Sequence, residues 1–149
     1  MKELLVFRAG AQTFGIPVSQ VGVVFPVAEI DPLPNAPGTI RGIVNIHGTV
    51  TPVIDLQRRF THIDATPHLD QRLILAFVGS RQFALLADDV DGVQRIPDAS
   101  ITDMEIAVPG AGIVTTVAAS GAGLIYIYDV DALLAASEEA LLDAALREA

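Results

Sequence analysis

The chain has 149 residues, a formal net charge of −9 at pH 7 and no cysteine, and 51% of its residues are hydrophobic. The negative charge argues against binding to nucleic acid or to anionic membrane surfaces, which require a basic face. Without cysteine the chain forms neither disulfides nor thiolate zinc sites. No apolar stretch reaches the roughly 20 residues that span a bilayer, and the N-terminal residues lack a secretion signal. The sequence predicts a cytoplasmic protein with a single domain over residues 1–149.

The first 40 residues predict short strands that are separated by glycine and proline. We expect strands at 4–7, 12–16 and 21–26, with one short helical turn that begins near Pro17. Residues 31–38 contain three prolines and predict a loop.

Residues 42–56 predict a β-hairpin with its turn at His47-Gly48. Apolar and polar residues alternate with the period of a strand that has one face on a core. The inward face would carry Gly42, Val44 and Ile46, and the outward face Arg41, Ile43, Asn45 and His47. Gly48 supplies the positive φ that a tight turn needs. Pro52 lacks a backbone N–H, so the second strand is expected at a sheet edge, where another chain can add on, or with a bulge.

The second half of the chain predicts further hairpins and turns. We expect hairpins over 72–87 and 112–128, a turn at 88–92, a short strand at 93–96 and a loop at 97–108.

Two helices are predicted at the C-terminal end. Asp131 can cap a short helix through Leu134, and Ser137 can cap a helix that extends to about Arg147. Four apolar residues of the last helix share one face, which we expect to pack on the body of the protein: Leu141, Leu142, Ala145 and Leu146.

The order of features in the first half recurs in the second half. Gly42-Ile43-Val44 recurs as Gly112-Ile113-Val114, Phe14 aligns with Phe83, and Asp55 aligns with Asp129. This order favours an internal duplication. Each half is too small to be stable alone, so the halves should share an apolar interface, and closed barrels would remove exposed strand edges.

The sequence offers few candidates for catalysis or metal binding. His62 and His68 lie in a polar connector with Asp64 and Asp70, but their spacing fits no standard metal-ligand motif, so we interpret them as solvated loop residues.

Asp55 and Asp129 each follow an apolar strand, and two roles are open for them. They could form the acid/base pair of a small hydrolase if they lay close together and desolvated. Their equivalent positions in the repeat favour the other role, capping of a helical turn after each strand. No phosphate-binding loop is present, and we expect no enzyme activity.

An ordered set of motifs runs through both halves of the chain. The first half contains Phe14-Gly15-Ile16-Pro17-Val18-Ser19-Gln20-Val21, Leu33-Pro34-Asn35-Ala36-Pro37, Ile40-Arg41-Gly42-Ile43-Val44-Asn45-Ile46-His47-Gly48 and Pro52-Val53-Ile54-Asp55-Leu56. The second half contains Ala84-Leu85-Leu86-Ala87-Asp88-Asp89-Val90, Gly112-Ile113-Val114 and Leu124-Ile125-Tyr126-Ile127-Tyr128-Asp129. Together these motifs, over about residues 4–134, resemble the CheW-type coupling domain of bacterial chemosensory systems.

The resemblance implies a mainly β, CheW-like fold of two SH3-like five-stranded β-barrel lobes with short helices. Lobe 1 would span about residues 11–66, lobe 2 about residues 2–9 plus 70–134, and a C-terminal helix residues 137–149. The first strand would cross to the second lobe.

The resemblance also implies a non-catalytic adaptor without cofactor or metal. Its partners would be the regulatory domain of a CheA-type histidine kinase, bound by the first lobe, and the cytoplasmic tip of a methyl-accepting chemoreceptor, bound in the groove between the lobes. A divergent scaffold or decoy for a separate two-component pathway is the alternative.

The segment Asn45-Ile46-His47-Gly48 stands where the family has Asn-Leu-Arg-Gly, so a histidine replaces the usual arginine. A histidine is shorter and lacks the permanent charge and forked donors of an arginine. We expect five residues of this hairpin to contact a partner: Arg41, Ile43, Asn45, His47 and Gly48. The alternatives are a core contact for Ile43 and a hydrogen bond within the turn for Asn45.

Overall fold

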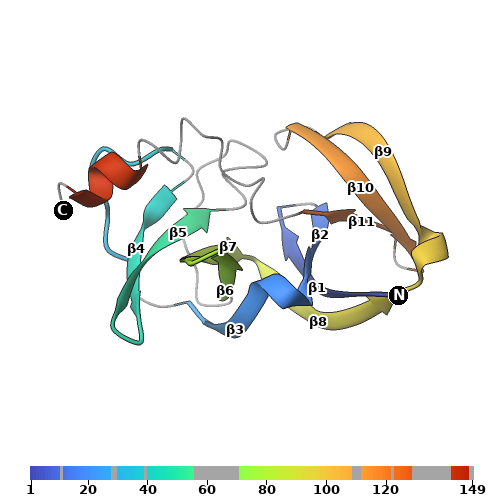
Figure 1. Cartoon of the computed structure of the whole chain (residues 1–149), viewed down its shortest axis with the longest axis horizontal. Helices are drawn as coiled ribbons and strands as arrows, with labels where there is room; N and C mark the ends of the chain where they lie inside the picture. The colour runs from blue at the N-terminus through green and yellow to red at the C-terminus, as the bar shows by residue number, and fades with distance from the viewer. Residues whose placement is uncertain are drawn as a thin grey trace.

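The structure is a computed structural model that describes residues 1–10, 12–27, 30–38, 40–55, 71–108, 112–121, 123–128 and 142–147. Within these residues the chain forms two β-sheets, two short 3-10 turns and a helix at 142–147 (Figure 1). The mainly β fold predicted from the sequence is confirmed.

Six strands form one sheet: β1 (Lys2–Ala9), β2 (Gln12–Pro17), β8 (Asp89–Ile96), β9 (Ile101–Val108), β10 (Gly112–Ser120) and β11 (Gly123–Ile127). Five strands form the other: β3 (Val21–Pro26), β4 (Ile40–Ile46), β5 (Thr49–Asp55), β6 (Arg72–Val78) and β7 (Arg81–Ala87). The strand orders are β8-β1-β2-β11-β10-β9 and β3-β6-β7-β5-β4. The 3-10 turns are η1 (Val18–Gln20) and η2 (Asp98–Ser100).

The predicted hairpins at 72–87 and 112–128 are confirmed as β6–β7 and β10–β11. The loop predicted at 97–108 is wrong, because β9 occupies it from Ile101 onward, and the turn predicted at 88–92 belongs largely to β8. Acidic residues obscure the strand pattern in both segments. The backbone groups of β9 nevertheless pair with β10, and those of β8 pair with β1. This long-range pairing outweighs the local sequence preference.

The two halves of the chain exchange their first hairpins. β3, β4 and β5 add to the β6–β7 hairpin of the second half, whereas β8, β10 and β11 add to the β1–β2 hairpin of the first half. The orders β3-β6-β7-β5-β4 and β8-β1-β2-β11-β10 are therefore equivalent, and β9 is an extra strand. This equivalence agrees with the sequence repeat, because Phe14 lies in β2 and Phe83 in β7.

The sheets do not follow the lobe boundaries expected from the sequence. β1 pairs with β8, as expected of a first strand that crosses over, but β2 falls within the expected lobe 1 and lies in the six-stranded sheet. β6 and β7 fall within the expected lobe 2 and lie in the five-stranded sheet. The reason is that each hairpin stays paired along most of its length, so both of its strands enter the same sheet. One sheet has six strands instead of the expected five because β9 is added to it.

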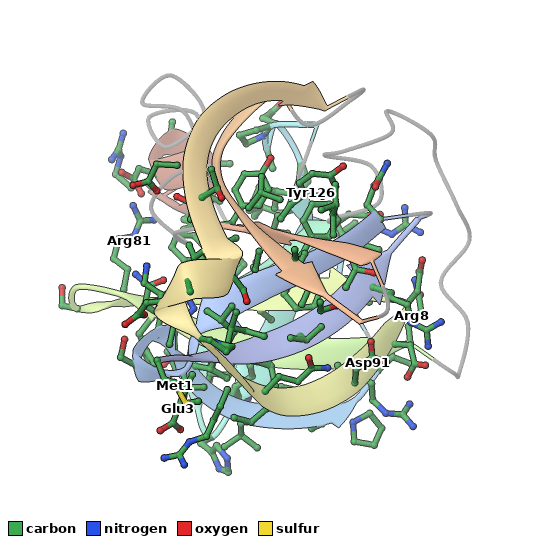
Figure 2. The ribbon with its side chains drawn as sticks, turned by 90° about the vertical axis from the view of Figure 1, so that its right-hand side faces the viewer. Met1, Glu3, Arg8, Arg81, Asp91 and Tyr126 are labelled. Atoms are coloured by element: carbon green, nitrogen blue, oxygen red, sulfur yellow. The ribbon has the colours of Figure 1, made fainter. Side chains whose placement is uncertain are left out.

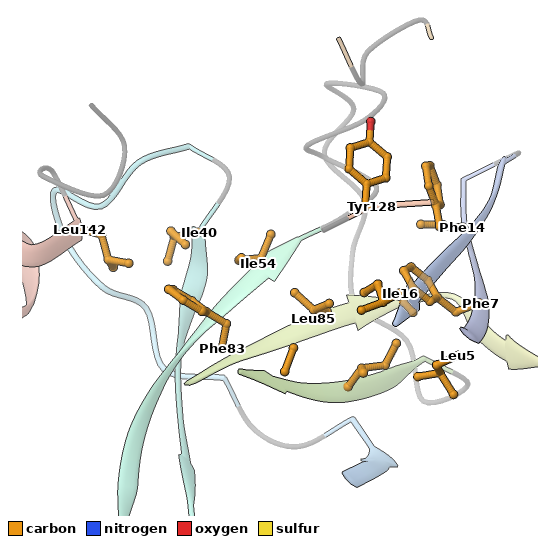
Figure 3. Close-up of a cluster of buried hydrophobic side chains, with 14 of the residues drawn as sticks. Leu5, Phe7, Phe14, Ile16, Ile40, Ile54, Phe83, Leu85, Tyr128 and Leu142 are labelled. Atoms are coloured by element: carbon orange, nitrogen blue, oxygen red, sulfur yellow. The ribbon is translucent and has the colours of Figure 1, made fainter. Parts of the chain in front are cut away.

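Three buried apolar clusters fill the described part of the molecule, and residues that alternate along the central strands face different clusters. In β7, Ala84 faces a cluster inside the five-stranded sheet, whereas Leu85 faces a cluster shared by both sheets. In β1, Val6 lies inside the six-stranded sheet, whereas Phe7 lies in the shared cluster. We call the shared cluster the inter-sheet core (Figure 3). It confirms the predicted apolar interface between the halves.

Phe14 lies at the centre of an aromatic group in the inter-sheet core. Its ring centroid is 6.0 Å from that of Phe7 and 5.7 Å from that of Tyr128. Phe14 is fully buried, so it contributes both apolar burial and ring contacts to the packing of the sheets.

The helix at 142–147 packs on the body of the protein, as predicted. Leu142 and Ala145 are 0% and 2% exposed and belong to the inter-sheet core, and Leu146 packs against it. Leu141 and the helix predicted at 131–134 lie outside the described residues. No helix in the described ranges has the length and apolar content needed to cross a bilayer.

Replacing Phe14 by alanine is expected to lower the free energy of unfolding by about 3–5 kcal/mol, because it removes a buried ring and leaves a cavity between the sheets. Urea denaturation followed by circular dichroism measures the loss. Val93→Ala is the control, since this β8 side chain is 57% exposed, and it should change stability by less than about 0.5 kcal/mol. Equal losses for the two variants would show that Phe14 is not a centre of the packing.

Candidate functional site on the β4–β5 hairpin

The predicted hairpin is formed by β4 and β5, and its turn is His47-Gly48. Both turn residues have positive φ, 51° for His47 and 84° for Gly48, which is the type I′ conformation that suits the twist of a two-residue hairpin. The predicted alternation along β4 is confirmed. Gly42, Val44 and Ile46 are buried, Arg41 and Ile43 are half-buried, and Asn45 and His47 are exposed.

Asn45 holds the turn in place. Its Oδ1 accepts a hydrogen bond of 2.8 Å from the backbone N–H of Gly48. The turn hydrogen bond considered for Asn45 is therefore confirmed. Because Asn45 is exposed, the same side chain remains accessible to a partner.

The edge position predicted for the strand with Pro52 is wrong, because β5 lies between β4 and β7 and the end of the sheet is β4. Ile43 is the register partner of Pro52, and its N–H and C=O both bond to Asp31 on the opposite side. Ile43 and Pro52 thus form a non-hydrogen-bonded pair, in which neither residue points its N–H at the other. The β5–β7 pairs begin only at Val53, so the missing N–H of Pro52 leaves no gap in either ladder.

The outer edge of β4 is closed by the chain itself. Asp31 N–H donates to Ile43 O at 2.9 Å, and Ile43 N–H donates to Asp31 O at 2.8 Å. Gly42 permits this close approach, because a Cβ at this position would lie 2.2 Å from the Asp31 carbonyl oxygen. A partner strand cannot add at Ile43 while Asp31 occupies these groups, so contacts at this position must come from side chains.

Ile43 and Arg41 are less available to a partner than predicted. The register of β4 shifts between Ile40 and Gly42, and Ile43 packs against the inter-sheet core. The core contact considered for Ile43 is therefore confirmed. Arg41 is mostly buried and its Nη1 lies 3.6 Å from Oδ2 of the buried Asp55. This pair compensates two charges at the base of the hairpin.

The Arg41–Asp55 pair gives Asp55 a structural role and does not favour the acid/base hypothesis. Asp129 and the helical turn that Asp55 was predicted to cap lie outside the described residues, as do the predicted connector residues His62 and His68. Among the described residues, no group of three or more histidine, aspartate or glutamate side chains could hold a metal ion.

The sequence analysis missed Val50, which is 59% exposed and is the cross-strand partner of Asn45. The two-residue turn contained the signal, because pairing Ile46 with Thr49 places Val50 opposite Asn45. We call the exposed residues Asn45, His47, Gly48 and Val50 the hairpin tip surface.

A second exposed apolar surface was also missed. Val23 and Val24 of β3 and Phe77 of β6 are large apolar side chains that remain exposed, and we call them the β3 surface. A Cβ on Gly22 would lie 2.8 Å from the Phe77 ring, so this glycine lets the ring lie against β3. The run from Val21 to Phe25 lacks alternation, so the sequence could not show which side chains are exposed.

Comparison with known proteins connects this two-sheet β-protein to a family. The model of the CheW-like domain matches residues 3–138. A chemotaxis protein CheW of Rhizobium meliloti is 32% identical over 100 residues, which cover 67% of this chain and 64% of that protein. A chemotaxis protein CheW of Klebsiella aerogenes is 27% identical over 144 residues, which cover 95% of this chain and 87% of that protein.

A solved structure is similar in fold. The scaffolding protein TtCheW of Thermoanaerobacter tengcongensis has a TM-score of 0.80 and 27% sequence identity, with 92% of this chain and 94% of that chain covered. The fold is therefore the two-sheet fold of CheW-like domains. The chain belongs to the CheW-like domain family, as its motifs predicted.

Gly42→Ala is expected to lower the free energy of unfolding by about 1–3 kcal/mol, because the new Cβ would displace Asp31 from the edge of β4. Thermal unfolding by calorimetry measures the change. Gly38→Ala is the control, since no atom lies within 4 Å of a Cβ built there. Unchanged stability of the Gly42 variant would show that Asp31 does not hold this edge.

Proposed function

We propose that this protein is a non-catalytic adaptor in the cytoplasm that couples chemoreceptors to a CheA-type histidine kinase in a chemosensory complex. Membership of the CheW-like family supports the coupling role, and the similar TtCheW is described as a scaffolding protein. The observation that carries the proposal is that the five-stranded sheet leaves apolar side chains exposed in two places, Val50 in the hairpin tip surface and Val23, Val24 and Phe77 in the β3 surface.

The hairpin tip surface is the proposed contact for the regulatory domain of the kinase. Val50 supplies an exposed apolar centre, and Asn45 and His47 supply a polar rim. Interfaces commonly combine a few apolar anchors with such a rim. The turn is held by the Asn45–Gly48 hydrogen bond, so little conformational entropy is lost when a partner binds.

The β3 surface is the proposed contact for the receptor tip. β3 follows β2 of the six-stranded sheet through η1 and pairs with β6 of the five-stranded sheet, so it lies where the two sheets meet (Figure 1). An apolar surface at this junction fits the groove between lobes in which the family resemblance places the receptor.

His47 favours a variant of this function. It is exposed at the turn, where the family pattern has an arginine that could form forked hydrogen bonds with a carboxylate. A divergent pathway with its own kinase and receptor is therefore the second candidate. The two candidates differ in the partner and not in the coupling role.

Val50→Asp is expected to weaken binding to the kinase regulatory domain by about tenfold or more, because it places a charge at the apolar centre of the contact. Isothermal titration calorimetry measures the affinity. Val93→Asp makes the same change at a residue of similar exposure on the other sheet, and it should bind like the unmodified chain. Equal affinity of the two variants would place the kinase contact elsewhere.

His47→Arg is expected to tighten binding to the kinase or receptor of a standard chemotaxis system by about threefold, because it restores a permanent charge and a forked donor. Kinase activity in reconstituted receptor arrays measures the coupling. Stimulation that is the same for both chains would show that residue 47 does not select the pathway.

A further inference from the structure

The helix at 142–147 covers the outer side of the hairpin base. Leu142 and Ala145 belong to the same buried cluster as Ile40 and Phe83, and Figure 3 shows Leu142 at the side of this cluster where Ile40 and Phe83 lie. The spacing of a leucine and an alanine three residues later presents one narrow apolar stripe to the sheet. The apolar surface beneath the helix therefore packs against a stripe that carries this spacing.

An exposed ion pair links the described helix to β7. Asp143 Oδ1 accepts a hydrogen bond of 2.9 Å from Arg81 Nη2, and this ion pair is 45% and 36% exposed. Arg81 also lies over the Phe83 ring, with Cζ 5.3 Å from the ring centroid. Between described residues, the helix is thus held by its buried apolar stripe and by an exposed ion pair.

The face beneath the helix continues into the hairpin tip surface. Ile43 packs against the inter-sheet core that contains Leu142. Asn45 follows two residues later on the same face of β4, and Val50 lies opposite Asn45 on β5. One outer face of the hairpin therefore runs from exposed residues at the tip to residues that lie against the covered core.

We propose that the helix at 142–147 is a displaceable cover on this face and limits the affinity of the partner that binds the hairpin tip surface. When the helix lifts, the partner gains apolar area next to the tip. The identity of the partner as a kinase regulatory domain rests on the proposed function. The inference that the helix is a cover is drawn from the packing of the helix and does not depend on the identity of the partner.

The first experiment tests the cover without a kinase. Asp143→Arg places two guanidinium groups opposite each other and leaves Arg81 on Phe83, and the double variant Arg81→Asp with Asp143→Arg restores an ion pair. In the full-length chain, hydrogen exchange of residues 142–147 should rise by about tenfold in the single variant and fall back in the double variant. A synthetic peptide with the sequence of residues 137–149 should bind the single variant at least about tenfold more tightly than the unmodified chain.

The second experiment measures binding of the kinase regulatory domain. The single variant should bind about threefold or more tightly, and the double variant should bind like the unmodified chain. Glu3→Arg is the matched control, because it breaks an exposed pair with Arg95 on the other sheet and should leave exchange and affinity unchanged.

Two sets of results would contradict the proposal that the helix is a displaceable cover. One is faster exchange with equal or weaker kinase binding, which would make the helix a structural support of the hairpin. The other is exchange and peptide binding that do not respond to Asp143→Arg. If the unmodified chain and the variants bind no kinase domain at all, the proposed function fails, and the peptide experiment alone decides whether the helix is a cover.

Discussion

The burial of two central hairpins on both of their faces is the constraint on which the rest of the structure depends. Strand side chains alternate with a period of two, so β1 and β7 each supply one row to the interior of their own sheet and another to the inter-sheet core. Each hairpin comes from one half of the chain and joins strands of the other half. Neither half can therefore complete its core without the other, and the fold forms as one unit.

The side chains proposed for partner contacts lie mainly on strands outside these central hairpins. In β4, Asp31 closes the backbone edge at Ile43 and Asn45 holds the turn, so side chains are available for contacts at these positions. Exposed strand edges invite uncontrolled pairing with other chains, and the bond to Asp31 removes that hazard at Ile43. The hairpin tip beyond Ile43 keeps exposed side chains in a fixed arrangement. Exposed side chains also lie over the other sheet, where Arg8 pairs with Asp91 (Figure 2). A partner bound at such a surface would be recognised by shape and side-chain chemistry.

The sequence predicts local features well and long-range choices poorly. The alternation from Gly42 to Ile46 and the positive φ at Gly48 follow from local rules, and the structure agrees with both. The exchange of hairpins could not be predicted, because the pattern of a strand shows which face is apolar and not which sheet it joins. The edge position predicted from Pro52 was wrong for a related reason. The free-energy cost of a proline in a strand depends on whether its cross-strand pair is hydrogen-bonded, which the sequence does not show. To predict that Val50 is exposed, the register of the hairpin must be known. To predict that Ile43 packs against the core, the bulge after Ile40 must be known.

The strand order also bears on how a small protein could couple two partners. The hairpin tip surface comes from β4 and β5, the β3 surface comes from β3 and β6, and β7 pairs with both β5 and β6. All five strands are hydrogen-bonded in one sheet whose central strands are buried on both faces. Two partners bound at these surfaces would be held in a fixed relative orientation, and binding of one would raise the effective concentration of the other. Coupling then requires no conformational change in the sheet, only that both surfaces be accessible together, and both are exposed in this structure.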